Sequence, residues 1–170
     1  FLTCYDEQAT ENLTIQLQKS TLVRSIFFLR DIPLQSSMML MHIAEKAIAD
    51  YALLQLKPVA VTIGAGALER MMAVAEDTNA AMVYADRYEL KTNGQDLTGK
   101  SLERHPVIDY QDGSLRDDFD FGSLLLICAS LLHKYSTTDR EADYRYAGFY
   151  DFRLFLSREG MLFHLNEYLY

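Results

Sequence analysis

The chain has little of what defines several specialised classes of protein. It has only two cysteines, Cys4 and Cys128, in 170 residues, too few for a disulfide framework. Each lies in or beside an apolar run, so we expect buried, reduced thiols and a cytoplasmic protein. No apolar run approaches the roughly 20 residues of a membrane-spanning helix. No signal-peptide pattern opens the chain, so the sequence predicts no transmembrane segment.

Positive charge is also scarce. The chain has 16 Lys and Arg against 24 Asp and Glu, which gives a net charge of −8 and a pI near 4.9. A nucleic-acid-binding surface needs a basic stripe to neutralise phosphates, so nucleic acid is not an expected partner. The acidic surplus is more typical of a solubility effect than of a function.

The short motifs of several enzyme classes are missing. There is no GxGxxG after the first strand-like run, no P-loop and no GxSxG elbow. There is no CxxC pair or HExxH, and no two of the four histidines have the spacing of metal ligands. The residues alone therefore predict no metal site.

The order of apolar segments is the positive signal. Strand-like runs at 1–5, 25–29, 51–56 and 80–85 alternate with helical patterns at 11–19, from Ser36 or Ser37 onward, and at 67–77. This alternation predicts a single α/β domain with parallel βαβ units and helices on both faces of the sheet. The run at 1–5 begins without an initiator methionine, so we expect a trimmed or partial chain.

The second half of the chain departs from this rhythm. We expect an edge-like strand at 87–91, a polar excursion at 92–103 and an extended segment at 105–110. A buried strand at 121–128, a short helix at 129–135, a helix at 146–157 that Gly160 ends, and a closing strand at 161–165 follow.

Charged residues follow each strand of the first half. Parallel strands end at one edge of a sheet, where ligands of α/β proteins collect, so these residues should share a rim. Carboxylates can accept hydrogen bonds from sugar hydroxyls and base N–H groups, and Arg or Lys can neutralise a diphosphate. The rim thus suits a sugar nucleotide, although polar residues also follow buried strands simply because loops are solvated. Its members are Asp6, Glu7, Arg30, Asp31, Lys57, Asp86 and Arg87.

Three further acidic residues are candidates for a functional role. Asp118 and Asp120 flank one phenylalanine in RDDFD, either as a solvated turn or in an acceptor-side role. Asp151 lies among aromatic residues of a predicted helix, where partial desolvation would suit it to general-base work. The alternative is a helix-surface carboxylate paired with Arg153 or Arg145.

Several segments, taken in order, resemble the GT-A domain of family 2 glycosyltransferases, most closely a divergent branch common in Bacteroidetes. They are FLTCYDE, SIFFLRD, DYALLQLKP, AAMVYADRYE, HPVIDYQDGSLRDDFDFGSLLL and YAGFYDFRLFLSREGMLFHLNEYLY. The resemblance spans nearly all of residues 1–170. It implies a Rossmann-like, three-layer α/β/α sandwich with a mostly parallel central sheet.

The resemblance also implies roles for individual residues. Tyr5, Asp6 and Glu7 match the first nucleotide-contacting loop. Arg30 and Asp31 fall where the family has an acidic pair that contacts the base, and only Asp31 keeps a carboxylate. Asp151 matches the base that deprotonates the acceptor hydroxyl in inverting transfer. The implied donor is a UDP- or GDP-linked sugar, and the implied acceptor is a saccharide or lipid-linked molecule. Such a protein would serve polysaccharide biosynthesis in the cytoplasm or at the inner face of the membrane.

One motif of the family is absent. Leu56, Lys57 and Pro58 stand where the family has the Asp-any-Asp motif that holds Mg²⁺ or Mn²⁺ and the donor diphosphate. Without these ligands, Mg²⁺ or Mn²⁺ would be held weakly, so we assign no metal cofactor. Two interpretations follow: a metal-independent glycosyltransferase in which Lys57 and Arg30 stabilise the leaving group, or a non-catalytic, glycosyltransferase-like domain that binds a sugar, a nucleotide or a protein partner.

Overall fold

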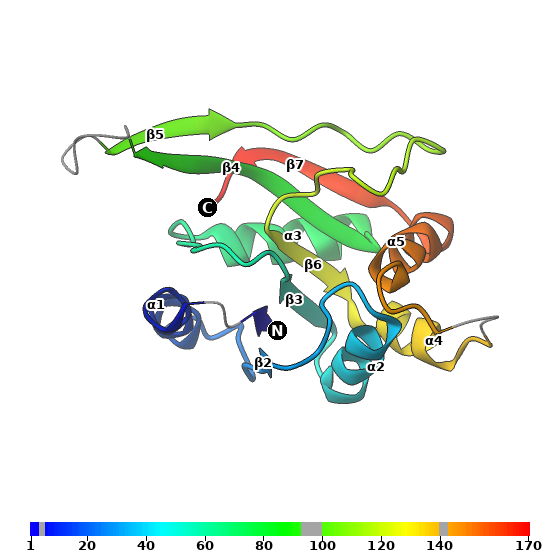
Figure 1. The fold of residues 1–170 in the computed structure, drawn as a ribbon. Coiled ribbons are helices and arrows are strands. Elements are labelled where there is room, and N and C mark those ends of the chain that lie inside the picture. Colours follow the sequence, from blue (N-terminus) through cyan, green and yellow to red (C-terminus); the bar gives the residue numbers. More distant parts are fainter. Residues whose placement is uncertain (4–5, 93–99, 140–142) are drawn as a thin grey trace.

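The computed structural model describes residues 1–3, 6–92, 100–139 and 143–170, which form an α/β fold (Figure 1). The strands are β1 (Leu2–Thr3), β2 (Phe28–Leu29), β3 (Tyr51–Gln55), β4 (Met82–Thr92), β5 (Lys100–His105), β6 (Leu124–Cys128) and β7 (Leu162–Tyr168). The helices are α1 (Glu7–Gln18), α2 (Ser37–Lys46), α3 (Ala67–Thr78), α4 (Ala129–Thr137) and α5 (Gly148–Glu159). The predicted alternation of strands and helices in the first half is confirmed.

The seven strands form one mixed sheet. Its order is β2-β1-β3-β6-β4-β5, and β7 pairs with β4. The pairs β1–β2, β1–β3 and β4–β7 are parallel, whereas β6 is antiparallel to both β3 and β4, and β5 forms an antiparallel hairpin with β4. The sheet is therefore less parallel than the sequence predicted. A strand buried on both faces is apolar throughout, so its sequence does not reveal its direction.

Helices cover both faces of the sheet, as Figure 1 shows. On one face, α2, α4 and α5 bury Ile43, Leu132 and Phe152 against the inner side chains of β3, β4 and β6. On the other face, α3 contributes Met71 and Val74, and α1 packs around Leu13 and Leu17. Because both faces are covered, binding chemistry is left to the edges of the sheet and the loops.

Local signals fix most helix ends. Ser36 caps α2 by accepting a hydrogen bond from the Met39 N–H on its Oγ at 3.1 Å. Asn79 ends α3 in the left-handed conformation, with φ 50°. Helix α1 begins four residues before the predicted range of 11–19. Asp6 is its cap, and its Oδ1 accepts from the Ala9 N–H at 2.7 Å.

The amino ends of α2 and α5 meet at Gly148. A Cβ atom on Gly148 would lie 2.2 Å from the Ser37 nitrogen, closer than any side chain allows. The Phe149 N–H donates to the Gln35 carbonyl at 3.1 Å, and the Ser37 N–H donates to the Tyr144 carbonyl at 2.8 Å. This contact fixes the position of α5, and with it Asp151 and Arg153.

None of the helices in the described ranges combines the length and the apolar character needed to cross a membrane.

Candidate functional site

The exits of β1 and β2 open into a hollow of about 700 Å³, here called the acidic hollow. Thr3, the last residue of β1, places this edge beside the exit of β3, because its Oγ1 donates to the Lys57 carbonyl at 3.3 Å. The Arg30 guanidinium lies 5.7 Å from the centre of the Phe28 ring. The lining residues are Asp6, Glu7, Thr10, Glu11, Thr14, Phe28, Leu29, Arg30 and Asp31. The structure thus brings together four of the predicted rim residues, those that follow β1 and β2.

The acidic hollow has more acceptors than cations. Four carboxylates line it with a single arginine, so it favours groups that donate hydrogen bonds over phosphate. Asp31 has a left-handed backbone, with φ 57°. Aspartate tolerates this conformation better than most residues, but it is still uncommon, and such backbones concentrate at functional sites. The hollow therefore suits a nucleobase or sugar edge better than a diphosphate.

The exit of β3 opens into a second hollow, of about 350 Å³, which Lys57 and Asp120 help to line; we call it the Asp120 hollow. The Lys57 ammonium donates to Asp120 Oδ1 at 2.6 Å, and Arg87 Nη2 lies 3.0 Å from Asp120 Oδ2. Asp120 lies just before β6, whose antiparallel direction brings its start to the exit of β3 and alongside β4, the strand that contains Arg87. Both cations expected to hold a diphosphate here are therefore paired with one carboxylate.

Asp120 is held in its charged form. Burial opposes this charge, but hydrogen bonds from Lys57 and the Gly122 N–H, together with the charges of Lys57 and Arg87, outweigh it and lower the pKa of Asp120 to about 2. A divalent cation does not fit here, because the Lys57 ammonium contacts one oxygen of Asp120 and the Arg87 guanidinium contacts the other. Within the described ranges, no group of three or more His, Cys, Asp or Glu side chains is arranged to hold a metal ion.

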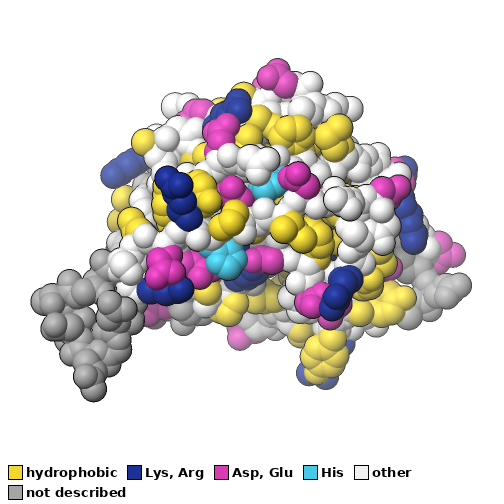
Figure 2. Space-filling model, turned by 90° about the horizontal axis from the view of Figure 1, so that it is seen from above, with side chains coloured by type: hydrophobic (Ala, Val, Ile, Leu, Met, Phe, Trp, Pro, Cys, Tyr) yellow, Lys and Arg dark blue, Asp and Glu magenta, His cyan; other side chains and the backbone are white. Residues whose placement is uncertain are grey.

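The hairpin of β4 and β5 adds charges that were not predicted. Glu89 Oε1 lies 2.8 Å from Arg87 Nη2 and 3.1 Å from His105 Nδ1, and His105 Nε2 lies 3.6 Å from Asp120. Figure 2 shows histidine side chains flanked by acidic ones on the face above the hairpin. The alternation of side chains along β4 would have placed Arg87 and Glu89 on one face. The pairing with His105 depends on the register of the hairpin.

Asp86 does not lie on the rim. It is buried, and its Oδ1 accepts from the Val107 N–H at 2.8 Å and contacts His164 Nε2 at 2.9 Å. The other ring nitrogen of His164 contacts Asp109 Oδ1 at 2.6 Å, and the ring stacks on Tyr84. Asp86 thus joins β4, β7 and the segment after β5, which is a structural role and not the predicted contact with a nucleotide sugar.

Asp151 lies apart from both hollows. The Tyr135 hydroxyl of α4 donates to Asp151 Oδ2 at 2.8 Å. On α5, Phe149 and Arg153 line the Asp120 hollow. Asp151 is two residues from each, about 200° around the helix, and so faces the other way. The predicted alternative pairing with Arg153 is also not found, because that guanidinium donates to the carbonyls of Phe119 and Asp117.

Arg153 has a structural role that the sequence did not predict. It is buried, and its guanidinium lies 5.2 to 5.7 Å from the ring centres of Phe121, Phe149 and Tyr150. Through its bonds to the 117–119 backbone, it holds the acidic turn that delivers Asp120. An arginine four residues after an aromatic on a helix is the one local signal of this role.

Tyr5, the remaining predicted contact, falls outside the described residues, as does Cys4. Of the other predicted residues, Asp6, Glu7, Arg30 and Asp31 share the acidic hollow, and Lys57 and Arg87 share Asp120. Asp86 and Asp151 stand elsewhere. Comparisons with protein-family models, curated proteins and solved structures found no match for this chain.

Proposed function

We propose that this chain is a nucleotide-sugar-binding domain of the family 2 glycosyltransferase type, built as a Rossmann-like, three-layer GT-A sandwich. The observation that carries the proposal is the acidic hollow, where the exits of the parallel strands β1 and β2 gather Asp6, Arg30 and Asp31 around one space. The helices on both faces of the sheet and the parallel direction of β1, β2 and β3 agree with such a fold.

In this proposal, the carboxylates of the acidic hollow accept hydrogen bonds from the N–H groups of uracil or guanine and from ribose hydroxyls. The diphosphate extends toward Lys57, which lies next to Thr3 at the same edge. There it replaces Asp120 as the partner of Lys57 and Arg87, so the charge of the leaving group is offset without a metal. Transfer of the sugar to a saccharide or lipid-linked acceptor, with inversion, completes the proposed reaction.

A non-catalytic binding domain is the second candidate, and one observation favours it. Asp151, the proposed base, is bonded to Tyr135 and faces away from the Asp120 hollow. A general base must come within hydrogen-bond reach of the proton it removes. Transfer therefore requires α5 to move or another group to act as the base, whereas binding requires neither.

Calorimetry with UDP, GDP and their sugars, in EDTA and in Mn²⁺, tests the shared part of both candidates. We expect binding that does not depend on the metal, that Asp31→Ala weakens at least about tenfold, and that Lys57→Ala also weakens. Asp50→Ala is the matched control, because this exposed aspartate precedes β3 at the opposite edge of the sheet. The absence of nucleotide binding in every condition would contradict the proposal.

A transfer assay separates the two candidates. Release of UDP or GDP from the donor in the presence of acceptor saccharides, lost in Asp151→Asn with donor affinity unchanged, supports the enzyme. Equal activity in Asp151→Asn removes Asp151 from the mechanism. Donor binding without transfer supports the binding domain.

A further inference from the structure

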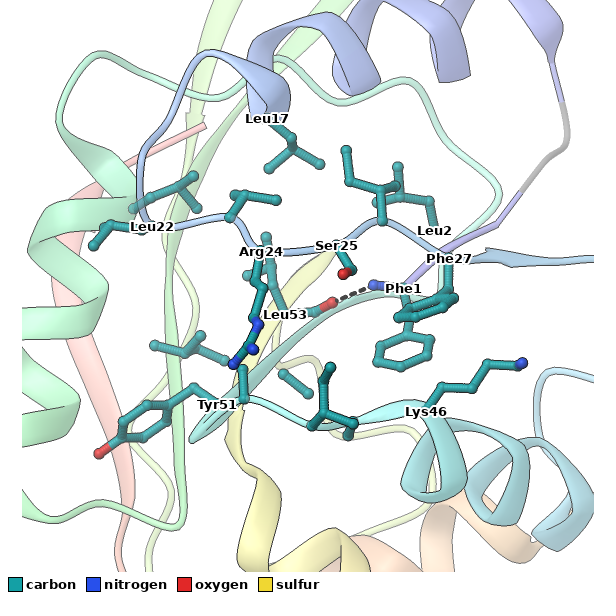
Figure 3. A pocket seen from close by; sticks show the side chains of 18 of the residues that line it. Phe1, Leu2, Leu17, Leu22, Arg24, Ser25, Phe27, Lys46, Tyr51 and Leu53 are labelled. Atoms are coloured by element: carbon teal, nitrogen blue, oxygen red, sulfur yellow. Dashed lines mark hydrogen bonds between the residues drawn. The ribbon is translucent and has the colours of Figure 1, made fainter.

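A mostly apolar cavity lies apart from the acidic hollow and the Asp120 hollow (Figure 3). It is a cavity of about 120 Å³ between residues 22–27, which lead into β2, and Tyr51–Leu53 at the start of β3. A single water molecule needs only about 10–15 Å³ on the same measure. The lining is mostly apolar, with Leu17 of α1 and Leu68 and Met71 of α3 among its members. The cavity is therefore larger than a single water molecule needs, and its lining is mostly apolar. It lies between segments that belong to neighbouring positions of the sheet.

Its position follows from the shortness of β1. This strand is two residues long, yet it lies between β2 and β3 in the sheet order. Its neighbours continue past it: β3 begins at Tyr51, four residues before the Leu2 partner Gln55, and residues 22–27 run on from β2. Figure 3 shows Phe1 at one end of the cavity, between Phe27 and Leu53. The cavity thus continues the line of β1.

The backbone hydrogen bonds around Phe1 already follow the pattern of a parallel ladder. The Leu2 N–H donates to the Phe27 carbonyl at 2.9 Å, and the Gln55 N–H donates to the Phe1 carbonyl at 2.9 Å. The Phe1 amino group donates to the Leu53 carbonyl at 2.7 Å. In such a ladder, successive residues of the central strand bond in turn to the strand on one side and to the strand on the other. The N–H and the carbonyl of any one residue point to the same side.

This alternation identifies the backbone groups that border the cavity. In the segment that leads into β2, the next groups that face the line of β1 are the Phe27 N–H and the Ser25 carbonyl. In β3, the corresponding groups are the Leu53 N–H and the Tyr51 carbonyl. A peptide backbone in the cavity would bond to all four, whereas a hydrocarbon chain would leave them without partners.

We propose that this cavity is a strand slot, which takes an extended apolar peptide segment that runs parallel to β3, ends at Phe1 and prolongs β1. The segment is apolar on both faces because α1 and α3 cover one face of the slot and the end of α2 the other. In a longer chain, the peptide N–H of Phe1 would keep the hydrogen bond to the Leu53 carbonyl.

The test compares the 170-residue chain with three versions that carry a tripeptide before Phe1. Val-Ile-Val supplies apolar side chains and all backbone donors. Val-Pro-Val keeps the apolar ends but removes the middle N–H, which the ladder directs to the Tyr51 carbonyl. Gly-Ser-Gly is the control: like the other two extensions it converts the amino group of Phe1 into an amide, but it offers no apolar side chains.

We expect Val-Ile-Val to raise Tm by about 5 °C or more over Gly-Ser-Gly, with Val-Pro-Val in between or lower. Hydrogen exchange at the Phe27 and Leu53 amides should slow at least about tenfold in the Val-Ile-Val chain relative to the Gly-Ser-Gly chain. Equal Tm values for all three extensions, or unchanged exchange at these two amides, would overturn the proposal. So would a rise in Tm of the 170-residue chain with decanoate but not with Val-Ile-Val, which would make the cavity a site for fatty chains.

Discussion

Lys57 and Asp120, which are 63 residues apart in the chain, form a hydrogen-bonded ion pair at 2.6 Å at the exit of β3. Asp120 also contacts Arg87, so one carboxylate occupies the place where two cations would receive an anion. The same pair stabilises this edge of the sheet and, in the proposed function, would compete with a diphosphate for it.

The Asp120→Asn variant should bind UDP about 5–10-fold more tightly than the unchanged chain, because a neutral amide competes less for Lys57 and Arg87. Isothermal titration calorimetry measures the change. Asp118→Asn is the control, since it removes the same charge from the same hollow but pairs with Arg116 at the surface. Equal tightening in both variants would mean that only net charge matters, and weaker binding in Asp120→Asn would refute the competition.

The Asp120 carboxylate should also contribute stability that depends on pH. Its pKa is lowered to about 2 in the folded protein from an ordinary value of 3.8, so its contribution is present above about pH 4 and is lost as the pH falls toward 2. Because the side chain is about a third exposed, solvent screening limits the contribution to about 1 kcal/mol. Urea unfolding of the unchanged chain and of Asp120→Asn should differ at pH 6 and converge near pH 2. A constant difference would show that the carboxylate charge has no part in it.

Asp31 should separate stability from binding. Asp31→Gly removes the cost of a left-handed side-chain-bearing residue at φ 57° and should raise the free energy of unfolding by about 0.5–1 kcal/mol. The same change should weaken UDP or GDP binding at least about tenfold, because it removes a carboxylate from the acidic hollow. Asp31→Asn, which tolerates the same backbone, should lose affinity without gaining stability. Undiminished affinity in both variants would exclude Asp31 from the nucleotide site.

Asp86 and Asp109 provide a matched pair around His164. The Asp86 side chain is 6% exposed and that of Asp109 is 70% exposed, although each contacts one ring nitrogen of His164. Asp86→Ala should lower the free energy of unfolding by about 3 kcal/mol, because it leaves the Val107 N–H and the His164 ring buried without their acceptor. Asp109→Ala should cost less than about 1 kcal/mol. Thermal and urea unfolding measure both, and equal losses would contradict a structural role specific to Asp86.

By itself, the sequence determined what local chemistry controls. Apolar runs and helical spacing predicted the alternation of the first half, and Ser36 and Asn79 marked helix ends because their side chains and backbone preferences act within a few residues. The gathering of Asp6, Glu7, Arg30 and Asp31 followed from the parallel direction of β1 and β2. The spacing of two residues between Asp151 and Arg153 also predicts that the two side chains lie on opposite faces of the helix.

Only the tertiary structure decided the direction of β6, the burial of Asp86 and the partners of Lys57. An apolar strand has the same pattern in both directions, so nothing in residues 124–128 shows that β6 runs antiparallel and brings Asp120 to the exit of β3 and to Arg87 of β4. The contact of Asp86 with His164 depends on the pairing of β4 with β7. Such pairings join residues distant in the chain, and their energy lies in packing and charge that no local pattern records.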